Sequence, residues 1–118
     1  MTKPDVLSQN YWRFLNLVSA IRGLPKLDAV EERVLNGLAA IWATGAKVTV
    51  LQAMELALDT SPTTVHRRLK SLREHGLIDL QEDATDSRIK YIVPTNAAKA
   101  YFAKLGQALE MAARQRSR

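Results

Sequence analysis

The clearest pattern of apolar positions lies between residues 61 and 76. One apolar face has the i, i+4, i+7 spacing of a helix: Val65, Leu69 and Leu72. Ser61 is a favourable N-cap, and Pro62 suits the first helical position because its missing N–H needs no partner there. Gly76 can end the segment in a left-handed conformation. The pattern therefore predicts a helix over residues 61–75.

The opposite face of this helix is polar in its first turn and basic in its middle. Its candidate contact residues are Thr63, Thr64, His66, Arg67 and Lys70. Small hydrogen-bonding groups beside cations suit a helix that approaches base edges and phosphates in a DNA groove. The same composition is also typical of an amphipathic helix whose charged face is merely solvated, and His66 fits either interpretation. Arg68 and Arg73 lie nearer the apolar stripe and are expected at the surface or in ion pairs.

A β-hairpin is predicted directly after this helix. Residues 77–82 and 89–93 have the alternating or β-branched character of strands, and residues 84–87 have turn chemistry. Pro94 ends the second strand and Thr95 can cap a further helix. A basic helix, a glycine stop and a hairpin with an arginine near its tip form the order of a winged helix–turn–helix. In that fold the helix enters the DNA major groove and the β-wing lies beside it.

The remaining chain predicts four more helices. They are expected over residues 8–21, from Asp28 to just before Gly45, over 49–58 and over 95–114. The second begins with a capping box made by Asp28 and Glu31. In the third, the buried side is expected to hold Leu51, Met54 and Leu58. The expected fold class is mainly α with a small β-hairpin (α+β), in a single domain over residues 1–118 with its core at about 28–94.

The first and last helices carry more apolar surface than one buried face requires. The residues expected to dimerise are Tyr11, Phe14, Leu15, Val18, Tyr101, Phe102, Leu105 and Leu109. We expect helices 8–22 and 95–114 to pack together and against their copies in a second chain. The alternative is that they only close the core of one chain, since a domain this small has little interior. A two-fold dimer would place two groove-entering helices about 34 Å apart, on a pseudo-palindromic DNA site.

Composition excludes several function classes. The 118 residues carry a formal net charge of +5, which favours a polyanionic partner. The chain has no cysteine and only two histidines, His66 and His75, so thiol catalysis and zinc sites lack their ligands. Its five glycines are too far apart for a phosphate-binding loop. We therefore expect no enzyme, no metal and no cofactor. A signal peptide and a membrane-spanning run are also not expected, which predicts a cytoplasmic protein.

An ordered set of residues resembles the MarR family of winged-helix transcription regulators. The matching residues are Val48-Thr49, Ser61, Thr64-Val65, Arg67, Leu69, Leu72, Gly76-Leu77-Ile78, Asp86-x-Arg88 and Thr95. The resemblance covers about residues 28–110. It departs from the family in a shorter chain, in Asp79-Leu80 where a basic residue is common, and in an acidic wing that holds Glu82, Asp83 and Asp86.

The resemblance implies roles for the wing and for an effector. Arg88 and Lys90 would contact DNA, and Asp86 would be structural, accepting hydrogen bonds in the turn and orienting Arg88. Regulators of this family often release DNA when a small aromatic compound binds between the DNA-binding lobe and the dimer helices. Such a pocket would be lined by Tyr11, Trp12, Phe14 and Trp42. For these four side chains we nevertheless expect core packing first, because aromatic stripes at helical spacing are usually core.

The sequence thus predicts a dimeric, sequence-specific regulator that binds double-stranded DNA, most simply a repressor that excludes polymerase from a promoter. Two alternatives stay open. The acidic wing is consistent with a winged helix that binds protein instead of DNA. A DNA-binding protein of replication or plasmid maintenance would have the same sequence features.

Overall fold

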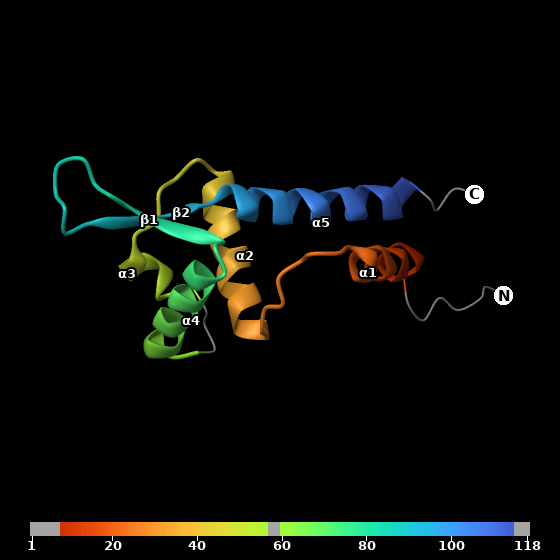
Figure 1. The fold of residues 1–118 in the computed structure, drawn as a ribbon, viewed down its shortest axis with the longest axis horizontal. Coiled ribbons are helices and arrows are strands. Elements are labelled where there is room, and N and C mark those ends of the chain that lie inside the picture. The colour runs from red at the N-terminus through yellow and green to blue at the C-terminus, as the bar shows by residue number, and fades with distance from the viewer. Residues whose placement is uncertain (1–7, 57–59, 115–118) are drawn as a thin grey trace. The chain divides into compact units, whose positions relative to one another are not determined.

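The computed structural model describes residues 8–56 and 60–114 of the chain (Figure 1). The elements in chain order are α1 (Gln9–Ala20), α2 (Ala29–Ala43), α3 (Val50–Ala53), α4 (Pro62–Glu74), β1 (Ile78–Glu82), β2 (Lys90–Pro94) and α5 (Asn96–Arg114). The expected fold class, mainly helical with one small hairpin, is confirmed. The chain divides into two compact units. One is Pro25–Ala98, and the other holds α1 and the part of α5 from Lys99 onward.

The capping residues expected from the sequence begin these helices. The Ser8 side chain accepts a hydrogen bond from the Tyr11 amide, and Asp28 and Glu31 form the predicted capping box of α2. Ser61 accepts from the Thr64 amide at 3.2 Å. Gly76 follows α4 with φ +78°, a conformation that glycine adopts without the strain of a Cβ. The Leu77 amide then donates to the Leu72 carbonyl, which completes the C-terminal cap of α4.

The third helix is much shorter than expected, and the prediction that Leu51 lies on its buried side was wrong. α3 is a single turn closed by a Thr49–Gln52 capping box. Leu51 is 73% exposed, whereas Ala53 on the opposite side of the turn is fully buried. Met54 is half-buried, and Leu58 lies outside the described residues. With one turn of helix, the spacing of apolar residues does not determine which side meets the core.

The core of the Pro25–Ala98 unit lies where α2, α4 and the hairpin meet. Its buried side chains include the predicted α4 stripe, Val65, Leu69 and Leu72, and the α2 residues Val34, Leu35 and Leu38. Leu77, Ile78 and Ile92 bury the hairpin against them. Because the apolar stripe of α4 is fully used in this core, the opposite face of α4 is presented to solvent.

The two strands pair antiparallel in the register Leu80↔Ile92, and the chain before α3 adds to their edge. Thr49 forms an isolated bridge with Tyr91, and the Ile92 amide donates to the Val48 carbonyl at 2.8 Å. Trp42 Nε1 donates to the Ile92 carbonyl at 3.0 Å. These contacts fix the base of the hairpin to α2 and α3, and they show that Trp42 has a structural role.

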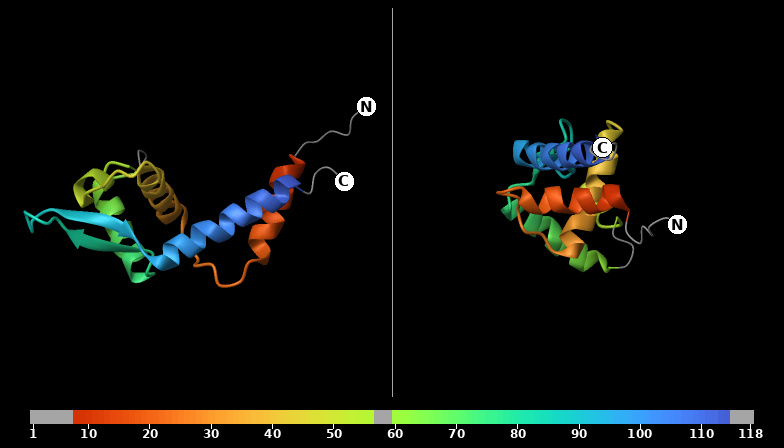
Figure 2. Two further views of the ribbon diagram at one scale, coloured as in Figure 1. Left: turned by 90° about the horizontal axis from the view of Figure 1, so that it is seen from above. Right: turned by 90° about the vertical axis from the view of Figure 1, so that its right-hand side faces the viewer.

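In the second unit α1 lies beside the C-terminal part of α5 (Figure 2). Ala108 and Ala112 are buried, but α1 has no buried residue. Tyr11 is 56% and Trp12 49% exposed, so the expectation of core packing was wrong for these two side chains. Leu15 and Leu109 are also exposed. None of the described helices is both long and apolar enough to cross a membrane.

Candidate nucleic-acid interface

A buried carboxylate links α4 to α2. The Glu31 side chain is only 6% exposed, and it accepts a hydrogen bond from the Asp28 amide at 2.8 Å and another from the Ser71 hydroxyl. His75 Nε2 lies 3.5 Å from the same carboxylate. A buried carboxylate requires such partners because burial removes its water. Glu31 therefore acts as a polar clamp that fixes the rotation of α4 about its axis.

Two cations of α4 are occupied by ion pairs. Arg68 Nε lies 2.9 Å from Asp28 Oδ2, in an ion pair that lacks the geometry of a hydrogen bond. Arg73 lies 3.4 Å from Asp79 at the start of the hairpin. Both residues were expected at the surface or in ion pairs, and this is confirmed. Their side chains support the position of α4.

The outward face of α4 carries the other cations. Thr63, His66, Arg67 and Lys70 are exposed, and Thr64 is half-buried with its hydroxyl accepting from Ser61 at 3.0 Å. Within residues 8–56 and 60–114, neither Arg67 nor Lys70 forms an ion pair or a hydrogen bond through its side chain. The structure thus brings the predicted contact residues of this helix onto one solvent-facing surface, with two positive charges available to a ligand.

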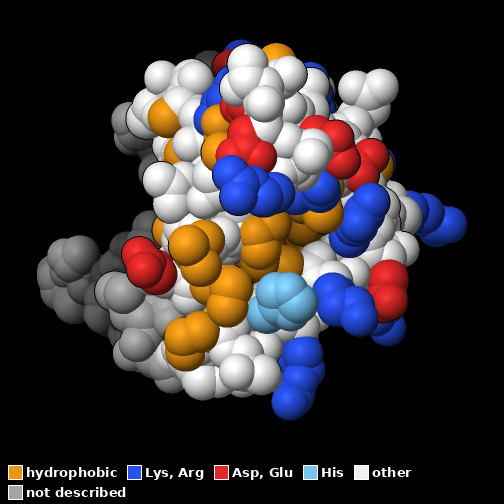
Figure 3. Space-filling model, turned by 90° about the vertical axis from the view of Figure 1, so that its left-hand side faces the viewer, with side chains coloured by type: hydrophobic (Ala, Val, Ile, Leu, Met, Phe, Trp, Pro, Cys, Tyr) orange, Lys and Arg blue, Asp and Glu red, His pale blue; other side chains and the backbone are white. Residues whose placement is uncertain are grey.

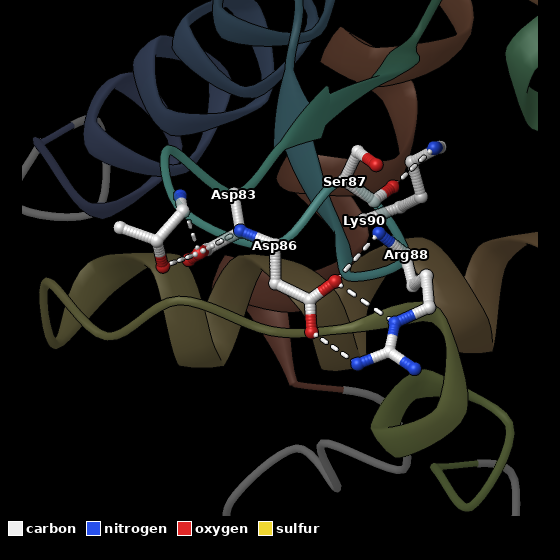
Figure 4. Close-up of polar contacts among 6 residues, drawn as sticks. Asp83, Asp86, Ser87, Arg88 and Lys90 are labelled. Atoms are coloured by element: carbon white, nitrogen blue, oxygen red, sulfur yellow. Dashed lines mark hydrogen bonds and ion pairs between the residues drawn. The ribbon is translucent and has the colours of Figure 1, made fainter.

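The wing tip is organised around Asp83 (Figure 4). Its carboxylate accepts from the Thr85 amide and hydroxyl, from the Asp86 amide and from the Tyr91 hydroxyl, at 2.8–3.1 Å. The two hydrogen bonds from Thr85, followed by the one from Tyr91, lower the pKa of Asp83 from 3.8 to about 2. The hydrogen bond from the Tyr91 hydroxyl to Asp83 also raises the pKa of Tyr91 above its usual value of 10.0. Asp83 is therefore ionised near neutral pH and holds the turn closed.

The predicted contact between Asp86 and Arg88 is present. Asp86 accepts from the Arg88 amide at 3.1 Å and from two guanidinium nitrogens at 3.0 Å each (Figure 4). This pairing lowers the pKa of Asp86 and raises that of Arg88. Lys90 Nζ donates to Glu82 at 3.1 Å and to the Ser87 carbonyl at 2.9 Å. Both cations of the wing are thus bound to carboxylates of the wing itself.

Charge therefore differs between the two parts of the candidate interface. The wing has four carboxylate residues, Asp79, Glu82, Asp83 and Asp86, against the two cations Arg88 and Lys90. α4 has the cations Arg67, Arg68, Lys70 and Arg73 with Glu74 as its one carboxylate. A polyanion would be attracted to α4 more strongly than to the wing.

Two residues of the site were not anticipated in these roles. Glu31 had been recognised only as a cap, because its contact with Ser71 spans 40 positions of sequence and leaves no local signal. From the sequence, Asp83 is identified only as an acidic residue of the wing. The spacing of Asp83, Thr85 and Asp86 is that of an Asx-type turn, in which a side-chain oxygen accepts from amides two and three positions on, and this signal was available.

Neither a family model nor a curated protein sequence matches the chain. Solved structures do match it. BpsR of Bordetella bronchiseptica is 17% identical with a TM-score of 0.54, over 92% of this chain and 74% of BpsR. YusO of Bacillus subtilis is 18% identical with a TM-score of 0.60, over 95% of this chain and 74% of YusO. A MarR-like transcriptional regulator of Thermotoga maritima is 18% identical with a TM-score of 0.61, over 97% and 79%.

The chain has the MarR-like winged-helix fold. At these identities the likeness establishes the fold, and the residues described above have to carry the functional argument. Within this winged-helix fold, α4 is the helix directly before the wing, and the β1–β2 hairpin is the wing. The winged-helix elements α2, α3, α4, β1 and β2 all lie in the Pro25–Ala98 unit.

Proposed function

We propose that this protein is a transcription regulator that binds double-stranded DNA through α4. The observation that carries the proposal is the outward face of α4, where Arg67 and Lys70 are exposed and have no partner among the described residues. Thr63, Thr64 and His66 lie on the same helix at its N-terminal end, where a groove-entering helix approaches base edges. Arg67 is the candidate for a base or phosphate contact, and Lys70 for a phosphate contact.

The regulator acts as a homodimer in this proposal. α1 has no buried residue, and Tyr11, Leu15 and Leu109 are exposed. Phe14, Val18, Tyr101, Phe102 and Leu105 are half-buried on the same two helices. Exposed apolar surface of this extent supports packing against a second copy. The dimer would bind a pseudo-palindromic site and act as a repressor by excluding polymerase.

A small aromatic effector belongs to the same proposal. The DNA binding of BpsR is regulated by 6-hydroxynicotinic acid. In this chain Tyr11, Trp12 and Phe14 are the aromatic side chains that could receive a ligand of that class, while Trp42 is engaged with the backbone of β2. No enzymatic step and no cofactor enter the proposal, and the site of action is the cytoplasm.

Fluorescence anisotropy with a labelled random duplex, at low and moderate salt, tests the proposal. Binding at micromolar concentration or tighter is expected at low salt. It should weaken steeply as salt rises, because cations that neutralise phosphates release counterions. Absence of binding at low salt would contradict the proposal.

The acidic wing favours a second candidate, a winged helix that binds a protein. Both wing cations are paired internally, Arg88 with Asp86 and Lys90 with Glu82, and Asp83 adds a further negative charge beside them. Affinity purification of partners with the wild-type chain and with a chain whose wing tip is replaced tests this candidate. A partner that is lost with the wing tip, in a protein that fails to bind duplex DNA, would replace the first proposal with the second.

A further inference from the structure

An apolar hollow lies between α3 and the tip end of the wing, with one residue of α4 at its rim. It has a volume of about 630 Å³ and lies within the Pro25–Ala98 unit. Its apolar lining residues are Val50, Leu51, Met54 and Ile89, and its polar rim includes His66, Arg88 and Lys90. Figure 3 shows hydrophobic side chains gathered on this face, bordered by a histidine and by Lys and Arg side chains.

The exposure of this surface requires an explanation. Leu51 is 73% exposed, the largest value among the exposed large hydrophobic side chains of the described residues, and Ile89 is 36% exposed. Leu51 belongs to the turn whose capping box fixes α3, and Ile89 is held by hydrogen bonds to Asp83 and Asp86. The backbone at both residues is therefore held by local structure, which keeps the two apolar side chains at the surface.

The position of the hollow indicates its occupant. The proposed function places α4 in a major groove, and the wing follows α4 directly along the chain. In a duplex, one sugar–phosphate strand separates a major groove from its neighbouring minor groove. A strand that runs from α4 toward the wing passes His66 and the wing residues 88–90, and these line the hollow together with residues of α3.

The chemistry of the lining agrees with this occupant. Among the described residues that line the hollow, none is an aspartate or glutamate. The rim holds His66 and the wing cations Arg88 and Lys90, whose carboxylate partners limit what a phosphate gains from them. The carbons of deoxyribose and the methyl group of thymine are apolar surfaces that aliphatic side chains contact in DNA complexes. A strand therefore offers an anionic edge for the rim and apolar carbons for the floor.

We infer that the hollow holds one sugar–phosphate strand of the bound DNA, with Leu51 and Ile89 packed against its deoxyribose carbons. This inference rests on the proposed function and adds a nonionic part to the interface. α4 supplies charge at Arg67 and Lys70, and the hollow supplies apolar contact. Loss of Leu51 should therefore lower DNA affinity without changing its dependence on salt, because no cation is removed.

The test compares four proteins by anisotropy on the same random duplex over a series of salt concentrations: wild type, Leu51→Ala, Leu51→Gln and Leu51→Met. Leu51→Ala and Leu51→Gln should bind about 3–10-fold more weakly because they lose most of the apolar contact. Leu51→Met keeps a side chain of similar size and should bind as the wild type does. The slope of affinity against salt should be equal in all four. Thermal unfolding should be unchanged, since Leu51 is largely outside the core.

Each other outcome has a distinct meaning. If Leu51→Ala and Leu51→Gln bind DNA with the same affinity as the wild type, this inference is overturned and the proposed function remains in place. The same applies if Leu51→Ala lowers the salt slope as loss of a cation would. Leu51-dependent binding of an acidic amphipathic peptide, with DNA affinity independent of Leu51, would assign the hollow to a protein partner instead. Failure of the wild type to bind duplex DNA at low salt would overturn both proposals.

Discussion

α4 and the wing both carry cations, but they present them to solvent differently. Arg67 and Lys70 extend from a helix whose other cations, Arg68 and Arg73, are paired with Asp28 and Asp79. On the wing, Arg88 and Lys90 are each bound to a carboxylate. An exposed ion pair stabilises a protein by at most about 1 kcal/mol, so a bound polyanion can break it. The free energy lost with the broken pair is subtracted from the free energy of binding. Of these two regions, α4 is therefore the one that has unpaired cations before DNA binds.

The two regions are also stabilised differently. α4 is fixed to α2 by the buried carboxylate of Glu31, whereas the wing tip is closed by the hydrogen bonds of Asp83, of which those from Thr85 are exposed and those from Asp86 and Tyr91 part-buried. A buried polar contact is costly to remove because its partners are left without water. An exposed one is readily replaced by solvent. The comparison indicates that the fold holds α4 firmly and the wing tip loosely.

The largest effect is expected from Glu31→Ala. The Ser71 hydroxyl and the Asp28 amide would lose their acceptor, and the free energy of unfolding should fall by about 1.5–3 kcal/mol. Denaturant unfolding followed by circular dichroism measures this change. Glu32→Ala, at an exposed neighbouring position, is the matched control and should leave stability nearly unchanged. Equal stability of the two variants would show that Glu31 does not clamp α4.

Arg67→Ala should have the next largest effect, and the effect should be on DNA affinity. Loss of this free cation is expected to weaken binding by about 1–3 kcal/mol, and to relax preference at one base pair if Arg67 contacts a base. Arg73→Ala removes a cation from the same helix that is already paired with Asp79, so it serves as the control. Anisotropy that ranks Arg73→Ala as the more damaging change would contradict the contrast between free and paired cations.

On the wing, Glu82→Gln should improve DNA binding. The substitution releases Lys90 from its partner and removes a negative charge, with an expected gain of up to about 1 kcal/mol, the size of an exposed ion pair. The gain should disappear in the double variant Glu82→Gln with Lys90→Ala. Weaker binding by the single variant would indicate that the Glu82–Lys90 pair is required as a unit.

The smallest effect concerns pH and the wing tip. Because the pKa of Asp83 is lowered from 3.8 to about 2, its ionised form stabilises the folded turn. This contribution is complete above about pH 4 and is lost as pH falls through about 2. An NMR titration of the Asp83 carboxyl should give this low pKa. In Tyr91→Phe the pKa should rise, because one hydrogen-bond donor is gone. A pKa near 3.8 in the wild type would show that the turn is open.

Much of the fold was predictable because it depends on local patterns. The apolar stripe of α4, its cap at Ser61 and its end at Gly76 follow from spacing and backbone preference, and all were confirmed. The placement of Leu51 was not predictable, since a single turn of helix has too few residues for its periodicity to select a face. The contact between Glu31 and Ser71 was also hidden, because it arises only when α2 and α4 pack.

The candidate contact residues of α4 followed from the same stripe, because the side opposite a buried face must be exposed. The sequence did not predict which of the described cations have a carboxylate partner and which have none. Arg67 and Arg73 belong to the same basic helix, yet only Arg73 has a carboxylate within reach, and that carboxylate comes from β1. Lys90 was likewise expected to be available, whereas the register of the hairpin places it opposite Glu82.

The most direct test of the account compares two double variants, Arg67→Ala with Lys70→Ala on α4, and Arg88→Ala with Lys90→Ala on the wing. The slope of log affinity against log salt is measured for each by anisotropy on one duplex. Each phosphate contact contributes about 0.9 to this slope on B-form DNA. The account predicts that the α4 pair lowers the slope by about 2 and the wing pair by less than about 1. A larger loss of slope from the wing pair would contradict it.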